Sequence, residues 1–230
     1  MSKMNLIIAG LICTSFLTFV LSGFRAEAAS EETKQKQVLG GWTLVEDNTP
    51  AMMSEKDSTR INTALKQSGD DLEALDLVAT QVVSGANYMY LTYGTIADNT
   101  VPGYYFVTVY EDAKGNNSMI ATLPLDVTAV QNGTPLGKGA TGAWAVHGSA
   151  KPGMFHDQNA QASFDAINNG DVMYNPVALL ATQVVSGTNY KALCMGNDKN
   201  LYVVTWYRDL KGNSSLTSTE CVNIGAYCGR

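Results

Sequence analysis

The stretch Thr80-Gln81-Val82-Val83-Ser84-Gly85, followed by Asn87-Tyr88, decides the fold of this chain. It recurs almost unchanged as Thr182-Gln183-Val184-Val185-Ser186-Gly187, followed by Asn189-Tyr190. β-branched residues that run into a Ser-Gly pair are typical of a strand that turns sharply and leaves as a second strand. The sequence therefore predicts the same hairpin loop twice, with glycines chosen for backbone angles that other residues avoid.

The repetition extends beyond this loop. Trp42 is matched by Trp144, 102 positions later, which is also the spacing of the two hairpin loops. Lys114-Gly115-Asn116 is matched by Lys211-Gly212-Asn213, 97 positions later, so the first copy carries five additional residues. They fall at 95–103 and are expected to form a longer surface loop away from the repeated hairpin. Self-similarity on this scale predicts two domains, 38–128 and 140–230, joined by a linker rich in glycine at 129–139.

Both copies have the same predicted order of elements. A helix comes first, with Ile61 and Leu65 on one face in the first copy and Phe164 and Ile167 in the second. Gly69 and Gly170 are expected to end these helices. Strands rich in valine, threonine and aromatic residues follow. The predicted fold class is α+β, with two domains that each consist of an antiparallel sheet wrapped around one helix.

The N-terminus has the pattern of a secretory signal peptide at 1–28. Lys3 precedes a mostly apolar run at 6–21, and Ala26-Glu27-Ala28 is a cleavage signal. A membrane anchor is the alternative, but the run is short for a span of about 20 apolar residues. A polar arm at 29–37 follows. The prediction is a secreted, periplasmic or extracellular protein that does not contact a membrane after the signal is removed.

The net charge of the chain limits the classes of partner that it is expected to bind. The formal net charge is −6, and cleavage after Ala28 would remove Lys3, Arg25 and Glu27 and leave −7. An acidic chain without a basic cluster argues against binding to nucleic acid. The sequence predicts no nucleic-acid partner.

Three cysteines follow the signal peptide, at Cys194, Cys221 and Cys228. Export permits a disulfide, but the odd number leaves at least one thiol free or paired between chains. A hydrolase that uses Cys194 with His147 or His156 is an alternative, although no Cys/His signature surrounds these residues. The histidines and Asp157 lack further ligands for a metal. The chain is predicted to be no enzyme and to need no metal or cofactor.

Gln-Val-Val-Ser-Gly followed by Asn-Tyr resembles the Gln-x-Val-x-Gly first hairpin loop of the cystatins, and the second copy is closest to the stefin branch. The cystatin family inhibits papain-like cysteine proteases. The resemblance implies a wedge formed by an N-terminal segment and two hairpin loops, which enters the protease cleft and covers the catalytic cysteine. In the first copy the implied protease-binding residues are Val38, Leu39, Gly40, Gly41, Gln81, Val82, Val83, Ser84, Gly85, Lys114 and Gly115.

The implied residues of the second copy are Gly142, Gln183, Val184, Val185, Ser186, Gly187, Leu210, Lys211 and Gly212. Both second hairpins depart from the family, since they lack its Pro-Trp or Leu-Pro-Gly. The second copy also has Ala140-Thr141-Gly142 where the first has Val38-Leu39-Gly40-Gly41. Because the aliphatic pair is present in the first copy alone, that copy is expected to be the tighter inhibitor.

These features predict a secreted, reversible, tight-binding inhibitor of papain-like cysteine proteases. The alternative is a non-inhibitory binding or structural module with the cystatin fold, because a fold does not by itself establish a function. Glycosylation sequons at Asn116 and Asn213 lie on the second hairpins, and a third is at Asn132. An inhibitor should carry no glycan at Asn116 or Asn213.

Overall fold

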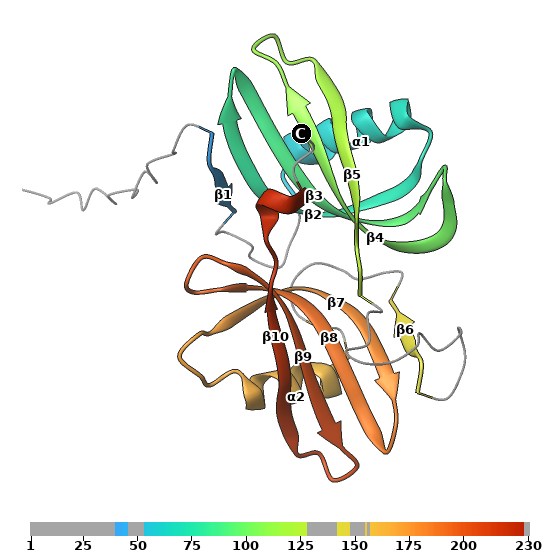
Figure 1. The fold of residues 1–230 in the computed structure, drawn as a ribbon, viewed down its shortest axis with the longest axis vertical. Helices are drawn as coiled ribbons and strands as arrows, with labels where there is room; N and C mark the ends of the chain where they lie inside the picture. Colours follow the sequence, from blue (N-terminus) through green and yellow to red (C-terminus); the bar gives the residue numbers. More distant parts are fainter. Residues whose placement is uncertain (1–39, 46–52, 128–141, 148–154, 156, 228–230) are drawn as a thin grey trace, which may run out of the picture. The chain divides into compact units, whose positions relative to one another are not determined.

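The computed structural model describes residues 40–45, 53–127, 142–147, 155 and 157–227 (Figure 1). These described residues belong to one compact unit. Among the described residues, no helix is both long enough and apolar enough to span a bilayer. The predicted signal peptide, polar arm and linker lie outside the described residues, as do Val38 and Leu39.

The first repeat forms a five-stranded antiparallel sheet in the order β1-β2-β3-β4-β5, with one helix (Figure 1). Its elements are β1 (Trp42–Leu44), α1 (Glu55–Ser68), β2 (Asp71–Val83), β3 (Gly85–Ile96), β4 (Asn99–Glu111) and β5 (Asn117–Leu125). Strands that follow one another in the chain are neighbours in the sheet. Short turns join β2 to β3, β3 to β4 and β4 to β5, whereas the connection from β1 to β2 contains α1.

The second repeat forms a sheet in the order β10-β9-β8-β7-β6, which is the same connectivity. Its elements are β6 (Trp144–Val146), α2 (Gln158–Ile167), β7 (Tyr174–Val184), β8 (Gly187–Gly196), β9 (Leu201–Asp209), β10 (Ser214–Cys221) and the 3₁₀ turn η1 (Ile224–Tyr227). Trp42 pairs with Gln81, and Trp144 pairs with Gln183. The residues that match between the two repeats in the sequence therefore also occupy matching positions in the strand pairing.

Both helices lie at the predicted positions and are capped locally. The Ser54 hydroxyl accepts a hydrogen bond from Asp57 N at 3.1 Å, and α1 ends at Gly69 in the left-handed conformation, with φ 79°. The Asp157 carboxylate caps α2. The expected stop at Gly170 is wrong, because α2 ends at Ile167 and Asn168 caps it.

The predicted α+β fold of two helix-wrapped domains is also wrong. The structure is mostly antiparallel sheet, with two five-stranded sheets and two short helices of 14 and 10 residues. Successive side chains of a strand point to opposite faces. On β3, Tyr90 packs in a cluster with α1, whereas Met89 and Leu91 lie in a second cluster. Each short helix packs against part of one face of its sheet, and the opposite face, which no helix wraps, is apolar as well.

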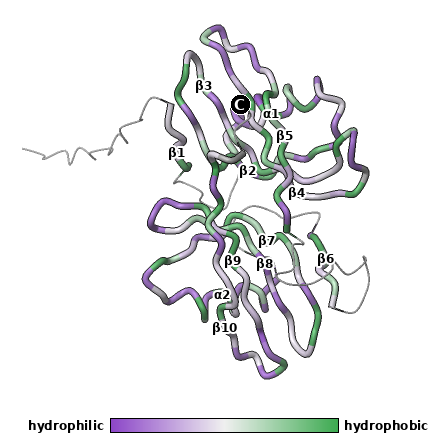
Figure 2. The backbone as a smooth tube through the Cα atoms, in the orientation of Figure 1, coloured by the Kyte–Doolittle hydropathy of each residue, from purple (hydrophilic) through white to green (hydrophobic). Residues whose placement is uncertain are grey.

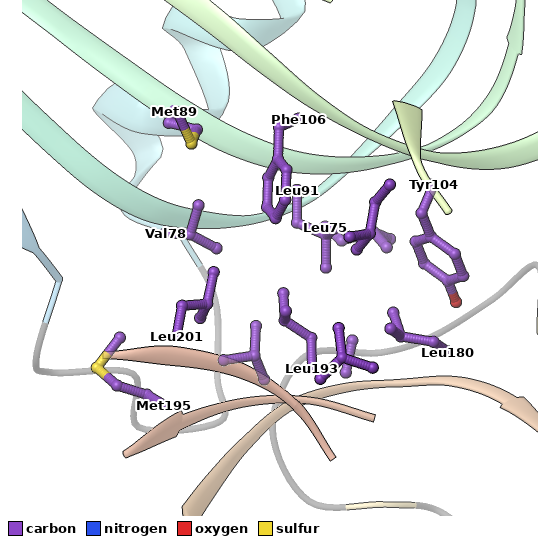
Figure 3. Close-up of a cluster of buried hydrophobic side chains, with 14 of the residues drawn as sticks. Leu75, Val78, Met89, Leu91, Tyr104, Phe106, Leu180, Leu193, Met195 and Leu201 are labelled. Atoms are coloured by element: carbon purple, nitrogen blue, oxygen red, sulfur yellow. The ribbon is translucent and has the colours of Figure 1, made fainter. Parts of the chain in front are cut away.

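These second faces meet in one hydrophobic cluster to which both sheets contribute (Figure 3). Leu75, Val78 and Phe106 come from the first sheet, and Leu193 and Leu201 come from the second. Hydrophobic and hydrophilic stretches alternate along the strands of both sheets (Figure 2). The proposed boundary between two domains stays a prediction, but the described part of the chain has a shared core.

Two polar contacts accompany this cluster. The Tyr104 hydroxyl donates to the carbonyl oxygen of His147, and Lys191 Nζ donates to the carbonyl oxygen of Val127 at 3.0 Å. Lys191 is 7% exposed, and its Nζ lies 4.6 Å from the centre of the Trp144 ring. These bonds join residues of different repeats. Because hydrogen bonds require a defined distance and angle, they make the otherwise apolar contact between the repeats geometrically specific.

The five additional residues of the first repeat do not form a longer surface loop. They lengthen β3 and β4 to 12 and 13 residues, against 10 and 9 in β8 and β9. The turn between β3 and β4 lies at the opposite end of the strands from the repeated hairpin, as expected.

Asp76 is a buried carboxyl group that should lower stability at neutral pH. It is 9% exposed on β2, and burial raises its pKa from 3.8 to about 6, against the lowering effect of the hydrogen bond from Leu77 N. The folded pKa lies above the unfolded value, so stability falls as pH rises from about 4 to about 6. The second repeat has Ala178 at this position.

We therefore expect Asp76→Asn to raise the free energy of unfolding at pH 7 by about 1–3 kcal/mol. The amide oxygen can still accept from Leu77 N. The gain should nearly vanish at pH 4, which urea unfolding at both pH values measures. Asp71→Asn, at an exposed position of the same strand, is the control. A variant no more stable than wild type at pH 7 would contradict the assignment.

Candidate functional site

Three segments of the first repeat meet at one end of its sheet, which we call the first edge. Val83 pairs with Gly85, so Ser84 alone forms the tip of the β2–β3 turn. Glu111 pairs with Ala86, which places the β4–β5 turn beside it. Gly40 N donates to the carbonyl oxygen of Val82 at 3.0 Å, which attaches the segment before β1 to the same end. The structure thus brings together the described residues that the resemblance implied for this copy.

Gln81 holds this edge together. Its Nε2 donates to the carbonyl oxygen of Gly40 at 2.9 Å, and its Oε1 accepts from Asn87 Nδ2 at 2.6 Å. The Tyr110 hydroxyl donates to the carbonyl oxygen of Ser84 at 3.1 Å. The polar atoms of Gln81 are therefore engaged within the protein, and its role is to position the edge.

The second repeat has the same hydrogen bonds at its own edge, the second edge. Gln183 Nε2 donates to the carbonyl oxygen of Gly142 at 2.6 Å, and Asn189 Nδ2 donates to Gln183 Oε1 at 2.6 Å. The Tyr207 hydroxyl donates to the carbonyl oxygen of Ser186 at 2.8 Å. Tyr110 and Tyr207 were not predicted as site residues, although their matching positions in the two copies were a usable signal.

Gly85 and Gly187 are required for close approach to the neighbouring strand. A Cβ atom on Gly85 would lie 2.4 Å from the carbonyl oxygen of Glu111 and 2.8 Å from the Tyr110 ring. On Gly187 it would lie 2.4 Å from the carbonyl oxygen of Arg208 and 2.6 Å from the Tyr207 ring. Gly85 does not have a positive φ. The expectation of unusual backbone angles is therefore wrong for Gly85, because the next strand takes the space of a side chain.

Gly85→Ala and Gly187→Ala should each lower the free energy of unfolding by about 1–3 kcal/mol, because backbone atoms must move to admit the methyl group. Thermal unfolding followed by circular dichroism measures this. Gly103→Ala on β4 is the control, since its Cβ would lie 3.9 Å from the nearest atom, in the Tyr105 ring. Equal midpoints for Gly85→Ala and Gly103→Ala would contradict the close-approach explanation.

The second hairpin turns are held by the same set of hydrogen bonds to an aspartate in both repeats, and we call this set the aspartate frame. Asp112 Oδ1 accepts from Lys114 N at 2.8 Å and Asn116 N at 2.9 Å, and Oδ2 accepts from Asn116 Nδ2 at 2.7 Å. Asp209 makes the equivalent bonds to Lys211 and Asn213, all at 2.8 Å. The asparagine side-chain bonds are the main reason that the pKa of each aspartate is lowered. A glycan at Asn116 or Asn213 would be attached to the same Nδ2 atom that donates to the aspartate.

The two edges differ in exposed apolar surface. Val83 is 38% exposed at the first edge. At the second edge Val184 is 68% exposed, Val185 42% and Leu210 84%. Gly40 and Gly142 have nearly the same φ, 81° and 82°, and the carbonyl oxygen of each accepts a hydrogen bond from the glutamine side chain of its own repeat.

The remaining candidate groups do not lie at these edges. Cys194 is fully buried, and burial raises the pKa of its thiol, so it is no accessible nucleophile. His147 Nε2 lies 3.1 Å from Thr182 Oγ1, and burial lowers the pKa of its ring. Cys221 is free and exposed, whereas His156 and Cys228 lie outside the described residues. Within the described ranges, no group of three or more His, Cys, Asp or Glu side chains could hold a metal ion.

The chain matches no protein-family model, and a search of curated proteins finds no match.

Proposed function

We propose that this protein inhibits papain-like cysteine proteases reversibly through its two edges. The observation that carries the proposal is the same arrangement in both repeats: three chain segments at one end of a sheet, fixed by Gln, Asn and Tyr hydrogen bonds. The likeness of the repeated loop to the Gln-x-Val-x-Gly loop of the cystatins supports the choice of partner. Residues 1–28 support export as part of the proposal.

Inhibition of this kind needs no chemical step by the inhibitor. A narrow projecting edge with apolar tips suits a concave cleft. The turns are already fixed by internal hydrogen bonds, so little conformational entropy is lost on binding. Valine side chains at the tips are stiff, which lowers that cost further. The edge would occupy the cleft and exclude substrate.

The test is a titration of active papain with the full-length mature protein, using a fluorogenic peptide substrate. We expect stoichiometric inhibition. Val83→Asp and Val185→Asp each place a charge at one tip without internal collision, since both valines are exposed. Each should weaken its own edge on the order of 100-fold, because an unpaired carboxylate would be buried in the complex, and together they should abolish inhibition.

Val101→Asp is the matched control, since Val101 is 65% exposed on β4, near the turn at the other end of the sheet. It should leave inhibition unchanged. A folded wild-type protein that does not inhibit papain would refute the proposal and favour the non-inhibitory binding module. Undiminished inhibition by the double variant would show that the edges are not the site.

A further inference from the structure

The β4–β5 and β9–β10 turns, which are the second hairpin turns of the two repeats, can be compared residue by residue. They are Asp112-Ala113-Lys114-Gly115-Asn116 and Asp209-Leu210-Lys211-Gly212-Asn213. The aspartate makes the same three hydrogen bonds in each. The two turns thus differ by Ala113 against Leu210, presented on equivalent frames.

Leu210 belongs to an apolar patch at the second edge. Gly187 pairs with Asp209, so the β7–β8 and β9–β10 turns lie next to each other. The patch consists of Val184, Val185 and Leu210, which are 68%, 42% and 84% exposed. A single exposed leucine is ordinary on a protein surface. Three exposed apolar side chains at the ends of two adjacent hairpins, whose turns are fixed by hydrogen bonds, form a preorganised contact surface.

From these observations, and resting on the proposed function, we infer that the second edge is the tighter protease-binding edge and that Leu210 is its specificity-determining residue. Leu210 would enter an apolar subsite of the protease cleft that Ala113 is too short to fill. This reverses the ranking expected from the sequence, which rested on Val38 and Leu39.

The physical reason is the apolar area that binding would remove from water. Each buried CH₂ group contributes about 0.8 kcal/mol, which corresponds to a factor of about four in affinity. Leucine exceeds alanine by three carbons, so its full burial would tighten binding roughly 30-fold or more. The aspartate frame already holds the turn, and little ordering is needed on binding.

The experiment measures papain inhibition by full-length variants in which one edge is disabled. With Val83→Asp, inhibition reports on the second edge, and with Val185→Asp it reports on the first. We expect Val185→Asp to cause the larger loss. Adding Leu210→Ala to Val83→Asp should raise the inhibition constant tenfold or more. Adding Ala113→Leu to Val185→Asp should lower it by a similar factor.

Leu216→Ala is the control, because Leu216 is 47% exposed and lies within β10, where it pairs with Trp206, outside the β9–β10 turn. It should leave the inhibition constant unchanged. Tighter inhibition by Val185→Asp than by Val83→Asp would overturn the inference while leaving the proposed function intact. So would self-association that Leu210→Ala removes without affecting inhibition, since the patch would then join two copies of this chain. Absence of inhibition by folded wild-type protein would overturn the proposed function and this inference together.

Discussion

Phe106→Ala should destabilise both repeats together, by about 3–5 kcal/mol. Phe106 is fully buried on β4 and belongs to the cluster that contains Leu193 and Leu201 of the second sheet (Figure 3). Removing the ring would leave a cavity lined by residues of both repeats. Because interiors are close-packed, the surrounding side chains can fill it only in part.

Urea unfolding followed by tryptophan fluorescence tests this coupling. The chain has three tryptophans, and Trp42→Phe would leave Trp144 and Trp206 to report on the second repeat. We expect these reporters to unfold at lower urea when Phe106, in the first repeat, is truncated. Ile120→Ala, at a 48% exposed position of β5, should shift the midpoint little. An unchanged second-repeat transition would mean that the shared cluster does not couple the repeats.

Arg60→Ala should cost about 3–5 kcal/mol at pH 7, because it leaves a partly buried carboxylate without its partner. Arg60 is 3% exposed on α1, and its guanidinium carbon lies 3.4 Å from the centre of the Tyr88 ring. It donates to Glu111 at 2.5 Å, to the Tyr90 hydroxyl at 2.9 Å and to Asp57. The substitution removes all of these bonds at once.

The cost should depend on pH in a defined direction. The hydrogen bond from Arg60 is the main cause that lowers the pKa of Glu111 below its usual 4.5. A depressed carboxyl pKa contributes stability above the unfolded value, and this contribution is lost as pH falls through the folded pKa. Urea unfolding should therefore show a smaller difference between Arg60→Ala and wild type below about pH 4 than at pH 7.

A double variant separates charge from packing. Arg60→Met with Glu111→Gln removes both charges and keeps most of the side-chain volume, so it should recover part of the stability lost in Arg60→Ala at pH 7. A loss that is equal at all pH values, and equal in the double variant, would assign the effect to packing alone.

The second repeat covers the equivalent tyrosine by different means. In the first repeat the ring of Tyr88 is covered by the guanidinium group of Arg60. In the second repeat the equivalent Tyr190 stacks on Trp206, with 5.2 Å between the ring centres. Trp206 Nε1 donates to Ser163 on α2 at 2.8 Å. The two repeats thus pack their helices with a charged network in one case and an aromatic cluster in the other. Residue-by-residue matching of the repeats did not predict this, because Arg60 and Trp206 are not at matching positions.

Local patterns of the chain predicted the repeated elements well. The Gln-Val-Val-Ser-Gly hairpins, the Lys-Gly-Asn turns and the two helices depend on neighbouring residues, and the structure places all of them as expected. The internal duplication also located the two edges. Such features can be predicted from a sequence because the hydrogen bonds that form them join residues close together in the chain.

The sequence by itself determined a duplicated strand–turn–strand chain with an edge in each repeat. The tertiary structure alone decided what surrounds those elements. It buried the second face of each sheet in a common core, placed Lys191 against Trp144, and exposed Leu210 and Val184 at one edge more than Val83 at the other. The physical reason is that strand alternation tells which residues share a face, whereas burial of that face depends on partners distant in the chain.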